Sequence, residues 1–145
     1  MKTTKLPETK LRKFLATQMD TFWQMTWHED REITPGVPDL HYVMKGGDHR
    51  VGWLELKAID TNLTKTQKIS VEPSQHQYLR RWGSVMPIHF LVRVLDHVYV
   101  IPSIYAKELN NATNETELMA MSSIHFYQRD MMKVLPAFLS GVTKV

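Results

Sequence analysis

The 145-residue chain is 43% hydrophobic and 23% charged, a composition typical of one globular domain with a core of its own. Its formal net charge of +3 permits a nucleic-acid partner without demanding one. Because the chain has no cysteine, a disulfide framework and a cysteine-ligated zinc site are both excluded.

The N-terminal segment contains no apolar run of the kind that forms a signal peptide. No stretch reaches the roughly 18 apolar residues that a membrane helix requires. We therefore expect a cytoplasmic protein with no membrane partner. We expect a single domain over residues 1–145, in which residues 1–7 form a mobile basic arm.

The first half of the chain predicts a helix followed by a β-hairpin. Between residues 8 and 27, apolar residues recur at spacings of three and four, the period of an amphipathic helix. After an irregular connection rich in proline and glycine, residues 40–44 and 51–58 have the composition of strands. The intervening residues 45–50 contain two glycines and predict the turn between these strands.

The second half predicts a loop, a helix and another hairpin. Residues 59–72 are polar, lack a periodic apolar pattern and indicate a flexible loop. A helix is expected to begin near Pro73, with Ser or Glu at its cap, and to end near Gly83. Residues 87–102 contain two β-rich runs, and the chain from Ser103 onward is expected to be mostly helical. This order predicts an α/β domain whose central mixed sheet is flanked by helices.

Two acidic residues and a lysine fall on the strands of the first predicted hairpin. Glu55 and Lys57 are two residues apart on one strand, so their side chains share a face. Asp39 begins the preceding strand, and pairing across the turn would bring its carboxylate toward that of Glu55. Two converging carboxylates repel each other unless they are protonated or bridged by a cation. The pattern predicts a site for a hard divalent cation, Mg²⁺ with Mn²⁺ as a substitute.

Such a cation would lower the pKa of a bound water, polarise a phosphoryl oxygen and position the reactants in phosphodiester hydrolysis. Lys57 would orient or deprotonate the attacking water, or stabilise charge on the phosphorane. The role of base requires surroundings that depress the pKa of the lysine. The sequence leaves the choice among these roles open.

The spacing of these residues resembles that of a known nuclease superfamily. A Pro-Asp pair ending at Asp39, then fifteen residues, then Glu-Leu-Lys from Glu55 to Lys57 is similar to the PD-(D/E)xK motif. Three further features point to particular groups within this superfamily: Gly36, the apolar run before Glu55, and Gln75 in a later helix. With them the chain resembles virus-type replication-repair nuclease domains and archaeal-type Holliday-junction resolvases.

The resemblance implies a restriction-endonuclease-like fold, metal-dependent cleavage of DNA and often a homodimer. It also implies that Asp39 and Glu55 bind the metal together with the carbonyl oxygen of Leu56. Lys57 would be the catalytic lysine, and Gln75 resembles a helix glutamine that lies near the active site and is counted here with the catalytic residues.

Members of the superfamily often carry a further acidic metal ligand on the first helix. Glu8 is the best match, because it lies on the side of the apolar stripe that contains Leu11 and Leu15 and well upstream of Asp39. Glu32, just before the segment that ends in the Pro-Asp pair, is the competing candidate. The question of one or two metal ions stays open with this choice.

Basic residues concentrate near the N-terminus and after the motif, where they would contact DNA phosphates. The residues expected to bind DNA are Lys10, Arg12, Lys13, Lys65, Lys68, Arg80 and Arg81. The tryptophans are interpreted as core residues in preference to base-stacking platforms. His41, which shares a strand face with Asp39, is interpreted mainly as a hydrogen-bonded structural residue that has some chance of touching substrate.

Together these features predict a Mg²⁺- or Mn²⁺-dependent endonuclease acting on branched DNA, including four-way junctions. A chain of this size leaves no room for a separate sequence-reading domain, and a two-fold substrate would be matched by a homodimer. We expect the loop 59–72 to engage the junction and to order on binding. The compact form resembles viral versions, whose compartment would be the host cytoplasm. The alternatives are an exonuclease or a flap or mismatch nuclease of the same superfamily, and a catalytically inactive DNA-binding module.

Overall fold

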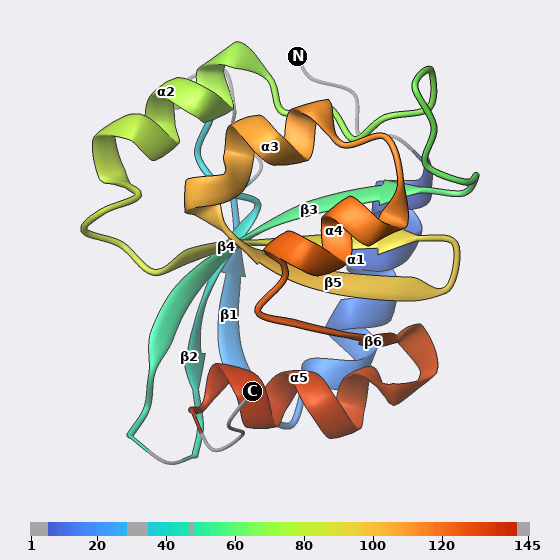
Figure 1. Ribbon diagram of the computed structural model, residues 1–145. Helices are drawn as coiled ribbons and strands as arrows, with labels where there is room; N and C mark the ends of the chain where they lie inside the picture. The colour runs from blue at the N-terminus through green and yellow to red at the C-terminus, as the bar shows by residue number, and fades with distance from the viewer. Residues whose placement is uncertain (1–5, 29–34, 47, 142–145) are drawn as a thin grey trace.

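The computed structural model of the chain describes residues 6–28, 35–46 and 48–141 (Figure 1). Six strands form one mixed sheet, and helices flank it. The strands are β1 (Trp23–Trp27), β2 (Leu40–Met44), β3 (Val51–Ile59), β4 (Ile88–Val94), β5 (His97–Pro102) and β6 (Ile124–Tyr127). The α-helices are α1 (Leu6–Met19), α2 (Pro73–Trp82), α3 (Ala106–Asn111), α4 (Glu115–Met121) and α5 (Met131–Leu139). Short 3₁₀ turns, η1 (Ser103–Tyr105) and η2 (Gln128–Asp130), precede α3 and α5.

The strands lie in the order of the sequence, from β1 at one edge to β6 at the other. All neighbouring strands are antiparallel except β3 and β4, which are parallel. A parallel pair needs a crossover connection, and α2 together with the loop before it supplies this connection. The fold class predicted from the sequence, an α/β domain with a central mixed sheet flanked by helices, is therefore confirmed.

An apolar cluster lies on each face of the sheet, and the second one is confined to β4, β5 and the end of β3. One cluster joins α1 and α5 to β1, β2 and β3 through residues such as Leu11, Leu54 and Leu135. The other joins α3, α4 and the loop before α2 to β4 and β5 through residues such as Phe90 and Leu118. Because alternate residues of a strand point to opposite faces, β4 and β5 contribute to both clusters, whereas β2 contributes to the first alone. Among the described residues, no helix combines the length and the apolar character needed to cross a membrane.

The first helix is shorter than the sequence suggested, and it begins earlier. It ends at Met19, and the residues Trp23–Trp27 that were expected to extend it form the edge strand β1. In that strand Trp23, Met25 and Trp27 pack against the core of α1 and α5, whereas the residues between them are exposed. This alternation has a period of two, which is the period of a strand. The same apolar residues also match the helical spacing of three and four, so the sequence pattern is compatible with both structures. Residues 6 and 7, assigned to a mobile arm, belong to α1, and residues 1–5 lie outside the described part of the chain.

Both predicted hairpins are confirmed. Strands β2 and β3 pair in antiparallel register across the turn 45–50, and β4 pairs with β5 across a turn that contains Leu95 with a φ of 57°. The predicted helix after Pro73 is also confirmed: Glu72 is its N-cap residue and Pro73 occupies its first turn. Proline fits there because its missing N–H would have no helical partner.

The loop before α2 contains no helix or strand from residue 60 to residue 72, as predicted, but it is anchored to the domain. Leu63, Ile69 and Val71 are buried in the cluster under α3 and α4. The backbone N–H of Val71 donates to the side-chain oxygen of Asn110 at 2.9 Å. The expectation of a flexible loop is therefore wrong at these anchor points, because three apolar side chains in a polar stretch are enough to fix it.

The C-terminal region is not purely helical. Between α4 and α5, the four residues of β6 pair with β5 and extend the sheet. Only Phe126 among them is buried, and it joins the core of α1 and α5. A strand of four residues with one buried side chain has too little periodicity to be distinguished from a loop or a helix end.

Candidate active site

Asp39 directly precedes β2, and Glu55 lies in the neighbouring strand β3. The register of β2 and β3 ends at the pair Leu40 and Leu54, so Asp39 and Glu55 are the next residues beyond the last paired position. Residues opposite each other in an antiparallel pair have Cβ atoms about 4.5–5.5 Å apart. The hairpin therefore brings the two residues to the same end of the β2–β3 pair, as the sequence predicted.

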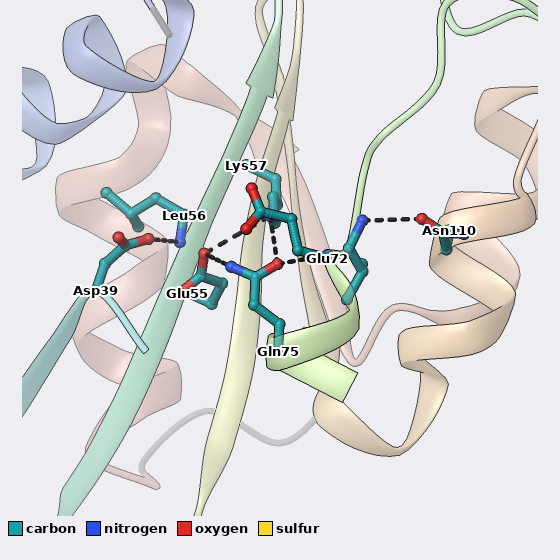
Figure 2. A network of polar contacts seen from close by, with 8 residues as sticks. Asp39, Glu55, Leu56, Lys57, Glu72, Gln75 and Asn110 are labelled. Atoms are coloured by element: carbon teal, nitrogen blue, oxygen red, sulfur yellow. Dashed lines mark hydrogen bonds and ion pairs between the residues drawn. The ribbon is translucent and has the colours of Figure 1, made fainter. Parts of the chain in front are cut away.

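Asp39 also forms a hydrogen bond to the backbone of β3 through its side chain. Its carboxylate oxygen Oδ2 accepts a hydrogen bond of 2.6 Å from the backbone N–H of Leu56. The N–H and C=O groups of one strand residue point to the same side of the strand, so the carbonyl of Leu56 also lies on the Asp39 side of β3. Figure 2 shows Asp39 and Leu56 together on that side. The Asp39 carboxylate and this carbonyl therefore lie together where β2 and β3 part, beside the residue that follows Glu55 in β3.

Glu55 and Lys57 are buried on the face of β3 that α2 covers. Their residues are 3% and 4% exposed, and Lys57 Nζ lies 3.7 Å from Glu55 Oε2. On the opposite face, Leu54 and Leu56 pack into the core of α1 and α5. Charged side chains are seldom buried to this extent unless they are paired, because each ion loses its hydration. Burial of this ion pair therefore costs hydration free energy, which other contacts must offset.

Gln75 supplies those contacts from α2. Its amide nitrogen Nε2 donates to Glu55 Oε2 at 2.6 Å, and its oxygen Oε1 accepts from Lys57 Nζ at 2.9 Å. The same Oε1 accepts from the backbone N–H of Glu72 at 2.9 Å. An ammonium group and a backbone N–H can only donate, and a carboxylate can only accept, so these partners fix the orientation of the amide. Gln75 is 2% exposed and holds the two charges in one geometry.

The segment before Asp39 packs directly against the start of α2. Gly36 has a φ of +84°, a backbone conformation that side chains other than glycine rarely adopt. A Cβ atom at this position would lie 2.1 Å from the carbonyl oxygen of Ser74 and 3.1 Å from the backbone nitrogen of Gln75. The glycine therefore allows the strand that carries Asp39 to reach the helix that carries Gln75. Figure 2 shows Gln75 and Glu72 on the other side of β3 from Asp39.

The donor set at this site fits a hard divalent cation. Carboxylate and carbonyl oxygens are the ligands that Mg²⁺ prefers, and it usually binds through few protein groups while keeping several waters. No cluster of three or more His, Asp or Glu side chains that could hold a metal is found in the described ranges. The fit therefore rests on Asp39, Glu55 and the carbonyl of Leu56.

The two candidates for a further acidic ligand are placed differently. Glu8 lies in the first turn of α1, half-buried, on the helix whose buried residues Leu11 and Leu15 face the sheet from the side opposite α2. It does not form a cluster of three acidic or histidine residues with Asp39 and Glu55. Glu32 lies outside the described residues.

The basic residues expected to bind DNA divide into two groups. Lys10, Arg12 and Lys13 are on α1, and the second group is on the loop before α2 and on α2 itself: Lys65, Lys68, Arg80 and Arg81. These elements cover opposite faces of the sheet. All are exposed except Arg12, which is half-buried with its guanidinium 4.3 Å from the ring centre of Trp27. Lys10 forms an exposed ion pair of 3.8 Å with Asp60.

Two residues near the site, His28 and Trp53, were not identified as site residues from the sequence. His28 lies with His41 beside Trp53, and His28 Nε2 and His41 Nδ1 are 2.6 Å apart. Trp53 was interpreted as a core residue, but it belongs to neither apolar cluster. Trp82, interpreted in the same way, is 39% exposed. A signal for Trp53 was available, because it shares a strand face with Glu55 and Lys57, whereas the buried Leu54 and Leu56 lie on the opposite face.

No known protein family matches the chain, and none of the curated proteins is detectably similar to it in sequence. The functional interpretation therefore rests on the geometry of the site and on the motif that its residues form.

Proposed function

We propose that this chain is a Mg²⁺-dependent deoxyribonuclease of the PD-(D/E)xK type, with a restriction-endonuclease-like core. The observation that carries the proposal is the hydrogen bond of the Asp39 carboxylate to the backbone of Leu56, between Glu55 and Lys57, which Gln75 holds together. A buried ion pair contributes little net stability and often less than an apolar pair of the same size. Its presence at the meeting point of a second carboxylate and a backbone carbonyl therefore supports a chemical role over a structural one.

Mg²⁺ would be held by Asp39, Glu55 and the Leu56 carbonyl, and when bound it supplies Lewis-acid activation of a phosphodiester and of water. Lys57 sits two residues from Glu55 on the same face, so its ammonium group is directed at the same space as the carboxylate. There it orients the attacking water or stabilises the negative charge that develops on the phosphoryl oxygens. The amide of Gln75 binds both side chains and so fixes the geometry of the ion pair between Lys57 and Glu55.

For the substrate, we propose branched DNA, including four-way junctions. Support comes from the two groups of basic residues on opposite faces of the sheet, since contacts on both sides of one active site suit a substrate with more than one duplex arm. A homodimer would match the two-fold symmetry of a junction. Lys65 and Lys68 lie in the exposed part of the loop between its anchors Leu63 and Ile69, and this part remains the segment proposed to contact a junction.

The test is a panel of end-labelled substrates incubated with the wild-type chain in Mg²⁺, in Mn²⁺ and in EDTA. The panel contains a four-way junction, a 5′ flap, a single-mismatch duplex and a linear duplex of the same sequence. We expect metal-dependent cleavage with the junction cut fastest. Equal cleavage of all substrates, or digestion from the ends, would support a nuclease but contradict the preference for junctions, in favour of one of the alternative nucleases. Tight binding without cleavage in either metal would contradict an enzyme and support a DNA-binding module.

A further inference from the structure

The face of the sheet that carries Glu55 continues away from the candidate active site as an uncovered strip. The registers place Thr26, His41 and Trp53 in one row across β1, β2 and β3. The next row outward contains Gln24, Val43 and Val51, all of which are exposed. In the other direction, the registers end at Trp27, Leu40 and Leu54, and the next residue along each chain segment is His28, Asp39 or Glu55. The row of Trp53 is therefore the immediate neighbour of the row that holds the two carboxylates.

Three rings in these rows form one stack. The ring of His28 lies parallel to that of Trp53, with 5.1 Å between their centres and 24° between their planes. His41 contacts both, at 4.8 Å from His28 and 4.9 Å from Trp53. The backbone N–H of His28 donates to the carbonyl of Asp39 at 2.7 Å, which ties the stack to the active-site strand. All three residues are half-buried.

This stack is not part of either apolar core. None of its members belongs to the clusters on the two faces of the sheet. Stabilisation of the fold alone would not require a tryptophan and two histidines to remain partly exposed on a strip flanked by Val43 and Val51. Aromatic rings of this kind, partly exposed beside a site for phosphodiesters, are the groups on which nucleotides stack.

We propose that the stack of His28, His41 and Trp53 holds the nucleotide next to the scissile phosphate, through contact of its base with the exposed ring surfaces. This inference rests on the proposed function. Residues two apart on a strand are separated by about 6.6 Å, so Trp53 lies about one nucleotide of an extended strand away from Glu55. The rows of Trp53 and Val43 contain no carboxylate among their described members, so nothing there repels the phosphate that accompanies the base. The stack thus makes the substrate contact that places the scissile bond over Asp39 and Glu55.

The test compares cleavage of intact and abasic DNA. After the cut position is mapped on the preferred substrate, an abasic nucleotide is placed on either side of the scissile phosphate in turn, and kcat/KM is measured in Mg²⁺. The wild-type chain should cut one of the two abasic substrates about tenfold more slowly than the intact one, as expected for the loss of one stacked base. The variant Trp53→Leu should cut the intact substrate as slowly as the wild-type chain cuts the abasic one, and should show no further loss on the abasic substrate.

Two further variants separate contact from folding. Trp82→Leu removes another partly exposed tryptophan, one that stacks with Arg81 on α2, and it should keep the wild-type ratio between intact and abasic DNA. If Trp53→Leu fails to fold, His28→Gln replaces it and should also reduce that ratio. A purely structural role would slow both substrates equally and leave the ratio unchanged, which would overturn the contact. Equal rates on intact and abasic DNA for the wild-type chain would overturn it as well. Absence of any cleavage by the wild-type chain would instead overturn the proposed function, and the contact with it.

Discussion

Replacement of Gly36 by alanine tests whether the segment before Asp39 must touch the start of α2. The φ of +84° costs a residue with a Cβ about 1–2 kcal/mol. The new Cβ would also lie 2.1 Å from the carbonyl oxygen of Ser74, a backbone atom that cannot rotate away. The helix and the strand segment must then separate, and a backbone shift in packed structure costs about 1–3 kcal/mol more. We expect Gly36→Ala to lower the free energy of unfolding by about 2–5 kcal/mol, the sum of these two costs.

Gly46→Ala is the matched control, because a Cβ at Gly46 meets nothing within 4 Å. It makes the same chemical change in the turn between β2 and β3, and we expect it to alter the free energy of unfolding by no more than about 0.5–1 kcal/mol. Urea unfolding followed by far-UV circular dichroism measures both variants. Because Gly36 approaches the backbone of Gln75, metal-dependent cleavage should also fall in Gly36→Ala and not in Gly46→Ala. Equal stability of the two variants would refute the packing argument.

Three more predictions follow from the buried groups. Gln75→Glu replaces a donor 2.6 Å from Glu55 Oε2 with a carboxylate, so we expect a loss of about 3–5 kcal/mol in the free energy of unfolding, measured in urea, and a Gln75→Met variant should lose less. Mg²⁺ at about 100 times its dissociation constant should raise the free energy of unfolding of the wild-type chain by about 2.7 kcal/mol, seen as a higher Tm; the same rise in Asp39→Asn would argue against the assigned ligand. Burial lowers the pKa of His89, so the folded chain keeps this ring neutral while the unfolded chain binds a proton near pH 6.5. The contribution of the neutral His89 ring to the free energy of unfolding is therefore complete above about pH 6.5. It is lost as the pH falls below this value, by up to about 1.4 kcal/mol per pH unit. In His89→Phe, which retains an aromatic ring against Phe138, urea unfolding between pH 5 and 7.5 should show a shallower pH dependence than in the wild type; equal slopes would contradict the prediction.

The sequence predicted the centre of the fold better than its edges. The hairpin of β2 and β3 was predictable because apolar strand residues flank a turn with two glycines, and the position of α2 because proline and Glu72 mark its start. The edge strands β1 and β6 were not predicted. In β1 the apolar positions also fit the helical spacing set by α1, and only pairing with β2 decides in favour of a strand. In β6 one buried residue, Phe126, gives no period at all.

The candidate site was predicted in its main residues and missed in its surroundings. Asp39, Glu55 and Lys57 follow from motif spacing, and Gln75 follows from the family resemblance. In the structure Gln75 binds Glu55 and Lys57, and Asp39 binds the backbone of Leu56 between them. The stack around Trp53 depends on pairing between three strands, one of which had been interpreted as a helix, so no local pattern could reveal it. The close approach at Gly36 likewise depends on a contact between segments far apart in the chain.

Cleavage of a four-way junction by the wild-type chain and by Glu55→Gln tests the central claim most directly. Glu108→Gln is the control, because it makes the same change at an exposed position of α3. We expect the wild-type chain and the control to cut in Mg²⁺ and not in EDTA, and Glu55→Gln to cut at least about 100-fold more slowly while retaining its fold. Cleavage by Glu55→Gln at the wild-type rate, or none by the wild-type chain in Mg²⁺ or Mn²⁺, would contradict the assignment of Asp39, Glu55 and Lys57 as the active site of a nuclease.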